Sequence, residues 1–218
     1  MVFAAFVAGG AFAQVQLSAG GGFVFDGGRV GGLSLEAFGE SFSEHINHFG
    51  FGGFAFLDAT FAELSFGFMG GPARFGWEVS WPGGSESDTM SGSFLALDFS
   101  LLGKFPIVLG GGNMTFFPML GIGYNVVLSS RDEDGNDNFE RSDDSATELN
   151  TFRIQFGIGG DIDLSDTVFF RGSILGQYRF APSLYRDIAD GRSVVPGLSV
   201  DHHGGFGVSV RLAIGVRF

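Results

Sequence analysis

The sequence predicts an all-β protein: an eight-stranded, antiparallel, up-and-down transmembrane β-barrel with long connections at one end and short turns at the other. Three observations predict this fold. In the final segment the even positions from Phe206 to Phe218 are apolar, and the odd positions between them are small, polar or cationic. Because successive strand side chains point to opposite faces, this segment has one apolar face. Seven further segments alternate similarly, and long and short connections join them in turn, as is typical of membrane barrels.

The predicted strands follow one another along the chain, and each places its larger apolar side chains on one face. They are residues 15–26, 50–57, 61–69, 95–101, 116–128, 152–159, 168–180 and 206–218. Short links are expected at 58–60, about 103–113 and 161–166, and long connections at 27–49, 70–91, 131–148 and 181–204. The connection at 70–91 is expected to be a projecting hairpin. Ten strands would result if residues 31–49 formed another hairpin in the membrane.

The composition fits such a barrel and excludes other classes. Only 17% of the 218 residues are charged, whereas glycine (38) and phenylalanine (28) are abundant. Glycine lets strands bend, and phenylalanine can supply an apolar exterior. The uncharged run 105–130 is long enough for a membrane helix, but three consecutive glycines and Pro118 disfavour a helix there. The chain has no cysteine, which excludes disulfides and thiolate chemistry.

Acidic charge is concentrated in one segment of a chain whose formal net charge is −12. Residues 131–148 hold eight acidic side chains and two arginines, which is most simply a solvated loop. The acidic balance excludes nucleic acid as a partner. The spacing from Asp132 to Asp143 follows a calcium-loop register, but Asp137 occupies the place that needs glycine. We therefore expect no metal and no other cofactor.

The first residues predict an export signal. Residues 1–13 are an apolar stretch that ends in a small-x-small site formed by Ala11 and Ala13, so cleavage is expected before Gln14. The stretch departs from the usual pattern because it has no lysine or arginine. The predicted organisation is thus a signal peptide at 1–13 and one barrel domain at 14–218.

Together these features resemble the small bacterial outer-membrane barrels of the OmpA transmembrane-domain, OmpX and OmpW kind. The resemblance rests on the signal-like start, the eight alternating segments and the final strand 210–218, which ends in Phe218. It covers residues 15–218. It implies an integral protein of the bacterial outer membrane, with short periplasmic turns and long connections outside the cell. It assigns Phe218 to the signal read by the barrel-assembly machinery, and it makes that machinery and outer-membrane lipid the expected partners.

The inward face is expected to carry a network of charged side chains. Its predicted members are Glu63, Asp98, Arg153, Arg171, Arg179 and Arg211, with Arg217 at the rim. In an eight-stranded barrel the last strand faces the fourth and the seventh faces the third, and the bore is only wide enough for side chains to fill. We therefore expect Arg211 to reach Asp98 and Arg171 to reach Glu63. Paired charges of this kind would plug the lumen, because unpaired buried charges are costly.

Residues of the predicted long connections offer weaker candidates. All four histidines (His45, His48, His202 and His203) fall there, and His202 and His203 lie close to Ser199 and Asp201. A Ser/His/Asp set can be written from these residues, but triads are defined by geometry, so an enzyme is not expected. Trp77 and Trp81 are expected at the membrane–water boundary or, alternatively, in the packing of the hairpin.

The favoured function is a structural or surface-interaction role through the long external connections, including contact with a host or extracellular ligand. The alternative is a narrow channel, or an OmpW-like passage for small or hydrophobic molecules. A soluble lipocalin-like carrier would need an apolar interior and a polar exterior, which inverts the faces assigned above. A charge placed at Leu212 and one removed at Arg211 would distinguish the two assignments.

Overall fold

The structure is a computed structural model that describes residues 15–109, 113–131, 137–140, 149–182 and 198–218. These residues form ten strands. The strands are β1 (Leu17–Ala37), β2 (Glu40–Ala59), β3 (Ala62–Trp81), β4 (Gly84–Lys104), β5 (Ile107–Leu109), β6 (Met114–Arg131), β7 (Asp137–Glu140), β8 (Thr151–Asp163), β9 (Val168–Arg179) and β10 (Leu198–Arg217). No helix among the described residues is long and apolar enough to cross a membrane.

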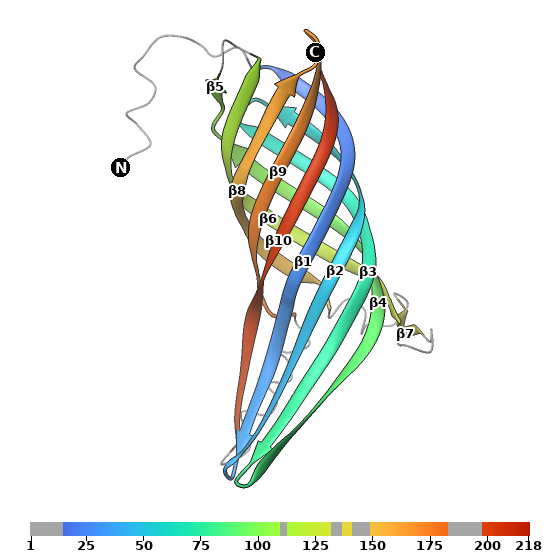
Figure 1. Cartoon of the computed structure of the whole chain (residues 1–218), viewed down its shortest axis with the longest axis vertical. Helices are drawn as coiled ribbons and strands as arrows, with labels where there is room; N and C mark the ends of the chain where they lie inside the picture. Colours follow the sequence, from blue (N-terminus) through green and yellow to red (C-terminus); the bar gives the residue numbers. More distant parts are fainter. Residues whose placement is uncertain (1–14, 110–112, 132–136, 141–148, 183–197) are drawn as a thin grey trace, which may run out of the picture.

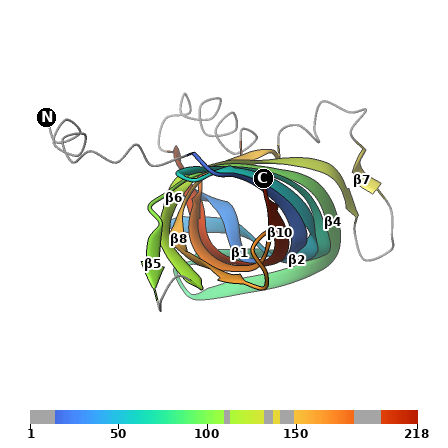
Figure 2. The same ribbon diagram turned by 90° about the horizontal axis from the view of Figure 1, so that it is seen from above.

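Eight of the strands close into an antiparallel ring. Their order is β4-β3-β2-β1-β10-β9-β8-β6, and a further pairing of β4 with β6 completes the circle. Viewed along its axis, the ring surrounds a single interior (Figure 2). The two short strands, β5 and β7, pair only with β6. The predicted count of eight principal strands therefore agrees with the ring, and residues 31–49 add no strand, because they are the ends of β1 and β2 and the turn between them.

Five strands continue well beyond the ring at one end. The ends of β1, β2, β3, β4 and β10 form a tapering sheet, which we call the extension (Figure 1). The opposite end, where β1 begins and β10 ends in paired register, we call the terminal end. The extension corrects the prediction of a long connection at 27–49 and confirms the projecting hairpin predicted at 70–91. The chain there is strand, and only residues 38–39 and 82–83 make the turns.

The two turns explain how the extension reverses. Phe38 (φ 55°) and Gly39 (φ 86°) both have left-handed backbones, as a two-residue hairpin turn requires. In the second turn Gly83 has a φ of 141°, which favours glycine. The extension parts of β2 and β4 were predicted as connections because neither of their faces is continuously apolar, whereas β3 carries Phe75, Trp77, Val79 and Trp81 on one face. Within the extension, Leu33 and Ile46 pack with Ala181 and with neighbouring apolar side chains, so apolar contacts add to the backbone hydrogen bonds between these strands.

The two faces of the ring differ sharply in chemistry. Large apolar side chains cover the outward face; among them Phe23, Phe68 and Ile214 are each more than half exposed. Polar and charged side chains fill the interior, where Gln155, Arg153 and Glu63 are buried. This arrangement agrees with the alternation predicted for the strands and is opposite to that of a soluble carrier with an apolar interior.

Aromatic residues gather where the outward face of the ring ends, on the side of the extension. Tyr178 contacts Phe180 and Phe206, and Phe152 contacts Phe180, with ring centroids 5.0–5.6 Å apart. Trp77 and Trp81 are not part of this group. They occupy odd positions of β3, the same face as Glu63 and Ser65, and they lie on the extension. Trp77 and Trp81 therefore lie in the β3–β4 hairpin of the extension, away from this aromatic group, and their position at a membrane boundary stays a prediction.

Candidate functional site

The candidate site is the charged interior of the ring. Among the described residues, five buried acidic side chains face five buried basic ones there. The acidic residues are Asp26, Asp58, Glu63, Asp98 and Asp161, and the basic residues are Lys104, Arg153, Arg171, Arg179 and Arg211. They come from seven of the eight ring strands, all except β6, so they surround the axis and do not lie on one wall. Removing charges from water is costly unless each is paired, so their contacts decide what the interior can do.

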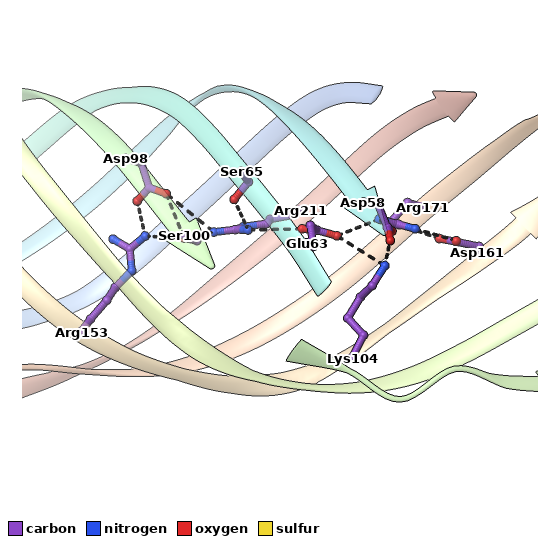
Figure 3. Close-up of polar contacts among 10 residues, drawn as sticks. All are labelled: Asp58, Glu63, Ser65, Asp98, Ser100, Lys104, Arg153, Asp161, Arg171 and Arg211. Atoms are coloured by element: carbon purple, nitrogen blue, oxygen red, sulfur yellow. Dashed lines mark hydrogen bonds and ion pairs between the residues drawn. The ribbon is translucent and has the colours of Figure 1, made fainter. Parts of the chain in front are cut away.

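Arg171 of β9 is the centre of the group nearest the terminal end (Figure 3). Its Nε and Nη2 donate to the two carboxylate oxygens of Asp161, both at 2.7 Å. Its Nη1 donates to Glu63 Oε2 at 2.7 Å and lies 2.6 Å from Asp58 Oδ2. Lys104 Nζ donates to Asp58 and lies 4.0 Å from Glu63 Oε2. Two cations and three carboxylates from five strands thus form one cluster across the lumen.

Aromatic rings enclose the Arg171 guanidinium on its remaining sides. Its central carbon lies 4.6 Å from the ring centre of Phe56, 5.0 Å from that of Phe169 and 5.2 Å from that of Phe117. A cation over an aromatic face is attracted by the ring quadrupole. Glycines make room for the rings: a Cβ at Gly20 would lie 2.6 Å from the Phe56 ring. Part of the abundant glycine therefore has a packing role inside the ring.

Asp98 of β4 is the centre of the middle group. Arg153 from β8 donates to Asp98, and Arg211 from β10 lies opposite, with its Nη2 3.7 Å from Asp98 Oδ1. Asn125 Nδ2 donates to Asp98 Oδ2 at 3.1 Å. Arg211 Nη1 also lies 3.9 Å from Glu63 Oε1, which connects this group to the Arg171 cluster. The charged contacts therefore run continuously along the lumen, as Figure 3 shows.

Asp26 of β1 holds a third group near the extension. It accepts hydrogen bonds from Arg179 and Gln177, both on β9. The His48 ring nitrogen Nε2 lies 2.6 Å from Asp26 Oδ1. His48 therefore lies in the interior and not in the predicted long connection, because β2 begins at Glu40 and not near residue 50.

The structure places all six predicted network residues in the interior. It brings Arg171 to Glu63 and Arg211 to Asp98, the two pairs expected across the lumen. The predicted set omitted four buried charges: Asp26, Asp58, Lys104 and Asp161. Asp26 was on the inward face of its predicted strand and could have been included by parity alone. The other three were assigned to turns, because the predicted strands ended too early.

The terminal end of the interior is closed by further ion pairs. Arg217 Nη1 lies 2.6 Å from Asp163 Oδ1, and its Nη2 lies 3.9 Å from Asp161 Oδ2. A polar cavity of about 80 Å³ lies beside these residues, lined by Lys104, Asp58 and Arg217 among others. The paired charges separate this cavity from the extension end of the lumen.

An apolar cavity of about 70 Å³ lies at the other end, between the charged interior and the extension. Its walls include Ile46, Met69, Phe75, Phe94, Ala96 and Val127, and its polar lining includes His48, Asn125 and Arg179. No sequence motif marked this cavity. The apolar wall residues named above come from four strands, β2, β3, β4 and β6, which are far apart in sequence.

The other predicted candidates are placed as follows. Ser199, Asp201 and His203 share one face of β10 at alternate positions, and the Asp201 carboxylate accepts a hydrogen bond from the backbone N–H of His202. Alternate strand residues are about 7 Å apart, which is beyond direct proton transfer between neighbours. On the same face of the extension, burial and the nearby Arg29 lower the pKa of His45.

Within the described residues, no three His, Cys, Asp or Glu side chains are grouped so that they could hold a metal ion. Most of the calcium-like register lies outside the described residues, as do Ala11, Ala13 and Gln14 of the expected signal cleavage. Phe218 is described; its backbone N–H donates to Leu17 at 2.9 Å and its side chain is 82% exposed. Its role in assembly stays a prediction.

Comparisons with known proteins were made for the whole chain. No family model matches it, and no curated protein matches it. Solved structures that resemble it include the translocator domain of the autotransporter NalP from Neisseria meningitidis, at 12% identity and a TM-score of 0.27, covering 93% of this chain and 89% of that one. Another is the outer membrane protease OmpT from Escherichia coli, at 7% identity and a TM-score of 0.26, covering 95% and 98%. At TM-scores this low, neither likeness indicates a function for this chain.

Proposed function

We propose that the chain is an integral β-barrel of the bacterial outer membrane, with eight spanning strands and a lumen closed by paired charges. Its role is to present the extension outside the cell as a structural or binding surface. The observation that carries the proposal is the inversion of the ring: below the extension, the outward face of all eight strands lacks charge, while five acidic and five basic side chains are buried inside.

The outward face has the dimensions of a membrane-spanning surface. On β1 the outward side chains from Leu17 to Gly27 are apolar or glycine. At about 3.3 Å per residue and a tilt of about 45°, that run spans roughly 25 Å, the height of the apolar band on membrane barrels. A closed ring also pairs every spanning backbone group, as a bilayer requires. The aromatic group of Phe152, Tyr178 and Phe206 then lies at the interface on the extension side.

The filled interior supports a non-conducting barrel. An eight-stranded ring leaves a bore that side chains can fill, and here ion pairs cross it from β9 to β3 and from β10 to β4. At the β3–β4 tip of the extension residues 82–89 are all exposed and mostly polar, which suits a position in water. Its external partner, like its contact with the barrel-assembly machinery, is part of this proposal.

Liposome insertion followed by proteolysis tests the proposal. The refolded chain should float with vesicles and should migrate differently on gels with and without heating. A glutamate-specific protease should then cut near Glu40 and Glu86 at the two tips, while Glu63, buried in the ring, stays intact. A chain that stays in the soluble fraction, or that is cut at Glu63 as fast as at Glu86, would contradict the proposal.

The apolar cavity favours a second candidate function, the binding of a small apolar molecule at the outer mouth. Ala96, which is 2% exposed, lines the cavity, so Ala96→Phe should fill it. We expect indole to bind the native protein, and this variant to lose binding while keeping its gel shift. Ala19→Phe, the same change on the outward face, is the matched control and should bind as the native protein does. Equal indole binding by both variants would exclude the cavity.

A further inference from the structure

The outward face of β1, β2 and β3 can be followed as a series of rows that cross the strands in register. The rows nearest the extension are apolar: Phe25 pairs with Phe51, and in the next row Gly27 pairs with Phe49. Pro72 is at the corresponding position of β3, between the pairs His48–Ala73 and Phe51–Gly70. One row further, the chemistry changes abruptly. Arg29 of β1 pairs with Asn47 of β2, and Asn47 pairs with Arg74 of β3. All three side chains are exposed. We call this set the Arg-Asn-Arg row.

The register fixes the geometry of the row. Neighbouring strands lie about 4.8 Å apart, so the Cα atoms of Arg29 and Arg74 are roughly 10 Å apart, on either side of the shorter Asn47. Two long guanidinium side chains at this spacing can reach a group held above the amide. Neither arginine forms an ion pair with another described residue, whereas five of the other described cations are buried in pairs.

Charges of the opposite sign lie farther from the apolar rows. On the same face of the extension, Glu78 and Asp201 are each more than one row closer to the turns than the Arg-Asn-Arg row. The next row contains His45 beside Gly76. On β1, β2 and β3 the first charged residues beyond the apolar surface are therefore the two arginines. They are positive although the chain as a whole has a formal net charge of −12.

We propose that the Arg-Asn-Arg row binds the phosphate of a lipid headgroup in the outer leaflet, an inference that rests on the membrane-spanning ring proposed above. Arginine pairs with phosphate through two parallel N–H donors, and the Asn47 amide adds another donor between the two guanidinium groups. Phe49 and Pro72, in the row below, contact the first carbons of the acyl chain. A headgroup is favoured over free phosphate because this polar row directly adjoins an apolar surface.

Native mass spectrometry of the refolded chain in dodecylmaltoside micelles tests the site. Dioleoylphosphatidic acid should bind at least about tenfold more tightly than dioleoylphosphatidylcholine, whose choline group masks the phosphate. The double variant Arg29→Gln/Arg74→Gln should bind the two lipids with about equal affinity. Inorganic phosphate at matched concentration should not displace the lipid; if it binds equally well, the lipid assignment is wrong.

Matched single variants separate a specific site from overall charge. Arg74→Gln and Arg131→Gln each remove one exposed cation, but Arg131 lies on β6, outside the row. We expect Arg74→Gln to reduce the preference for phosphatidic acid by about fivefold and Arg131→Gln by less than twofold. Equal losses would overturn the proposal in favour of unspecific attraction. A protein that floats with vesicles but shows no lipid preference refutes this inference alone, whereas one that does not float refutes the proposed function.

Discussion

At the residue scale, the interior depends on a few side chains that each satisfy several partners. Asp98 receives Arg153, Arg211 and Asn125 from three other strands. Arg171 joins three carboxylates and three aromatic rings. In a dry interior, removal of a shared partner costs more than the contact itself, because every charge that it served is left buried and unpaired.

Asp98→Asn should therefore destabilise the ring strongly. The change keeps the shape of the side chain but leaves Arg153 and Arg211 without their shared carboxylate. We expect the free energy of unfolding to fall by about 3–5 kcal/mol, measured by urea titration in micelles with tryptophan fluorescence. Asp201→Asn, on the exposed surface of β10, is the control and should change it by less than about 0.5 kcal/mol. Equal stability of the two variants would show that the Asp98 contacts contribute nothing.

At the element scale, each ring strand is defined by the opposite chemistry of its two faces. In β10, Leu212 is 41% exposed on the outward face, while its neighbour Arg211 is 4% exposed inside. Such alternation is visible in sequence, and it predicted the eight ring strands and six of the ten charges buried inside them. It predicted the β3–β4 hairpin of the extension, where Trp77 and Val79 alternate with polar residues, but not the β1–β2 part, where Glu44 and His48 interrupt the apolar positions of β2.

The charged contacts of the interior could be predicted where they follow from the strand order and from which alternate positions of a strand face inward. Arg211 and Asp98 could be paired from strand order and inward parity alone. The enclosure of Arg171 by Phe56, Phe117 and Phe169 could not, because Phe56 interrupts the polar inward pattern of its strand and reads as an irregularity. The apolar cavity was equally hidden, since its walls depend on where the strands twist away from one another beyond the ring.

A charge on the outward face should be costly. Leu212→Arg near the middle of β10 should lower the free energy of unfolding in bilayers by roughly 2–4 kcal/mol, because the guanidinium would lie in hydrocarbon. Denaturant titration in phosphatidylcholine vesicles measures the effect. Ser199→Arg, on the part of β10 that belongs to the extension, serves as the control and should be nearly neutral. A harmless Leu212→Arg would mean that this face does not contact lipid.

The β3–β4 part of the extension should be removable without loss of the ring. Gly76 pairs with Thr89, so deleting residues 77–88 and joining the ends through Asn-Gly keeps the register of every ring pair. We expect the shortened chain to insert into vesicles and to keep its heat-dependent gel shift. Its unfolding midpoint should fall only slightly, since the ring contacts are unchanged. Failure of the shortened chain to insert would mean that the extension is needed to form the ring.

At the scale of the whole molecule, the lumen is a chain of ion pairs between a polar and an apolar cavity. We expect the refolded protein to be electrically silent in a planar bilayer at about 100 mV, because moving any one charge would break contacts with several others. Asp98→Asn, which frees two guanidinium groups, is the variant in which openings should first be seen. Discrete openings of the unaltered protein would instead make the lumen a narrow pore.

The equal numbers of buried acidic and basic side chains have one more consequence. A potential difference across a membrane does work on a protein in proportion to the charge that moves through it, about 2.3 kcal/mol per elementary charge per 100 mV. An interior with no net charge experiences no net force along the membrane potential. The arrangement of the buried ion pairs should therefore not change with the membrane potential. The formal net charge of −12 lies outside the interior, where its effects depend on the ionic strength of the surrounding water.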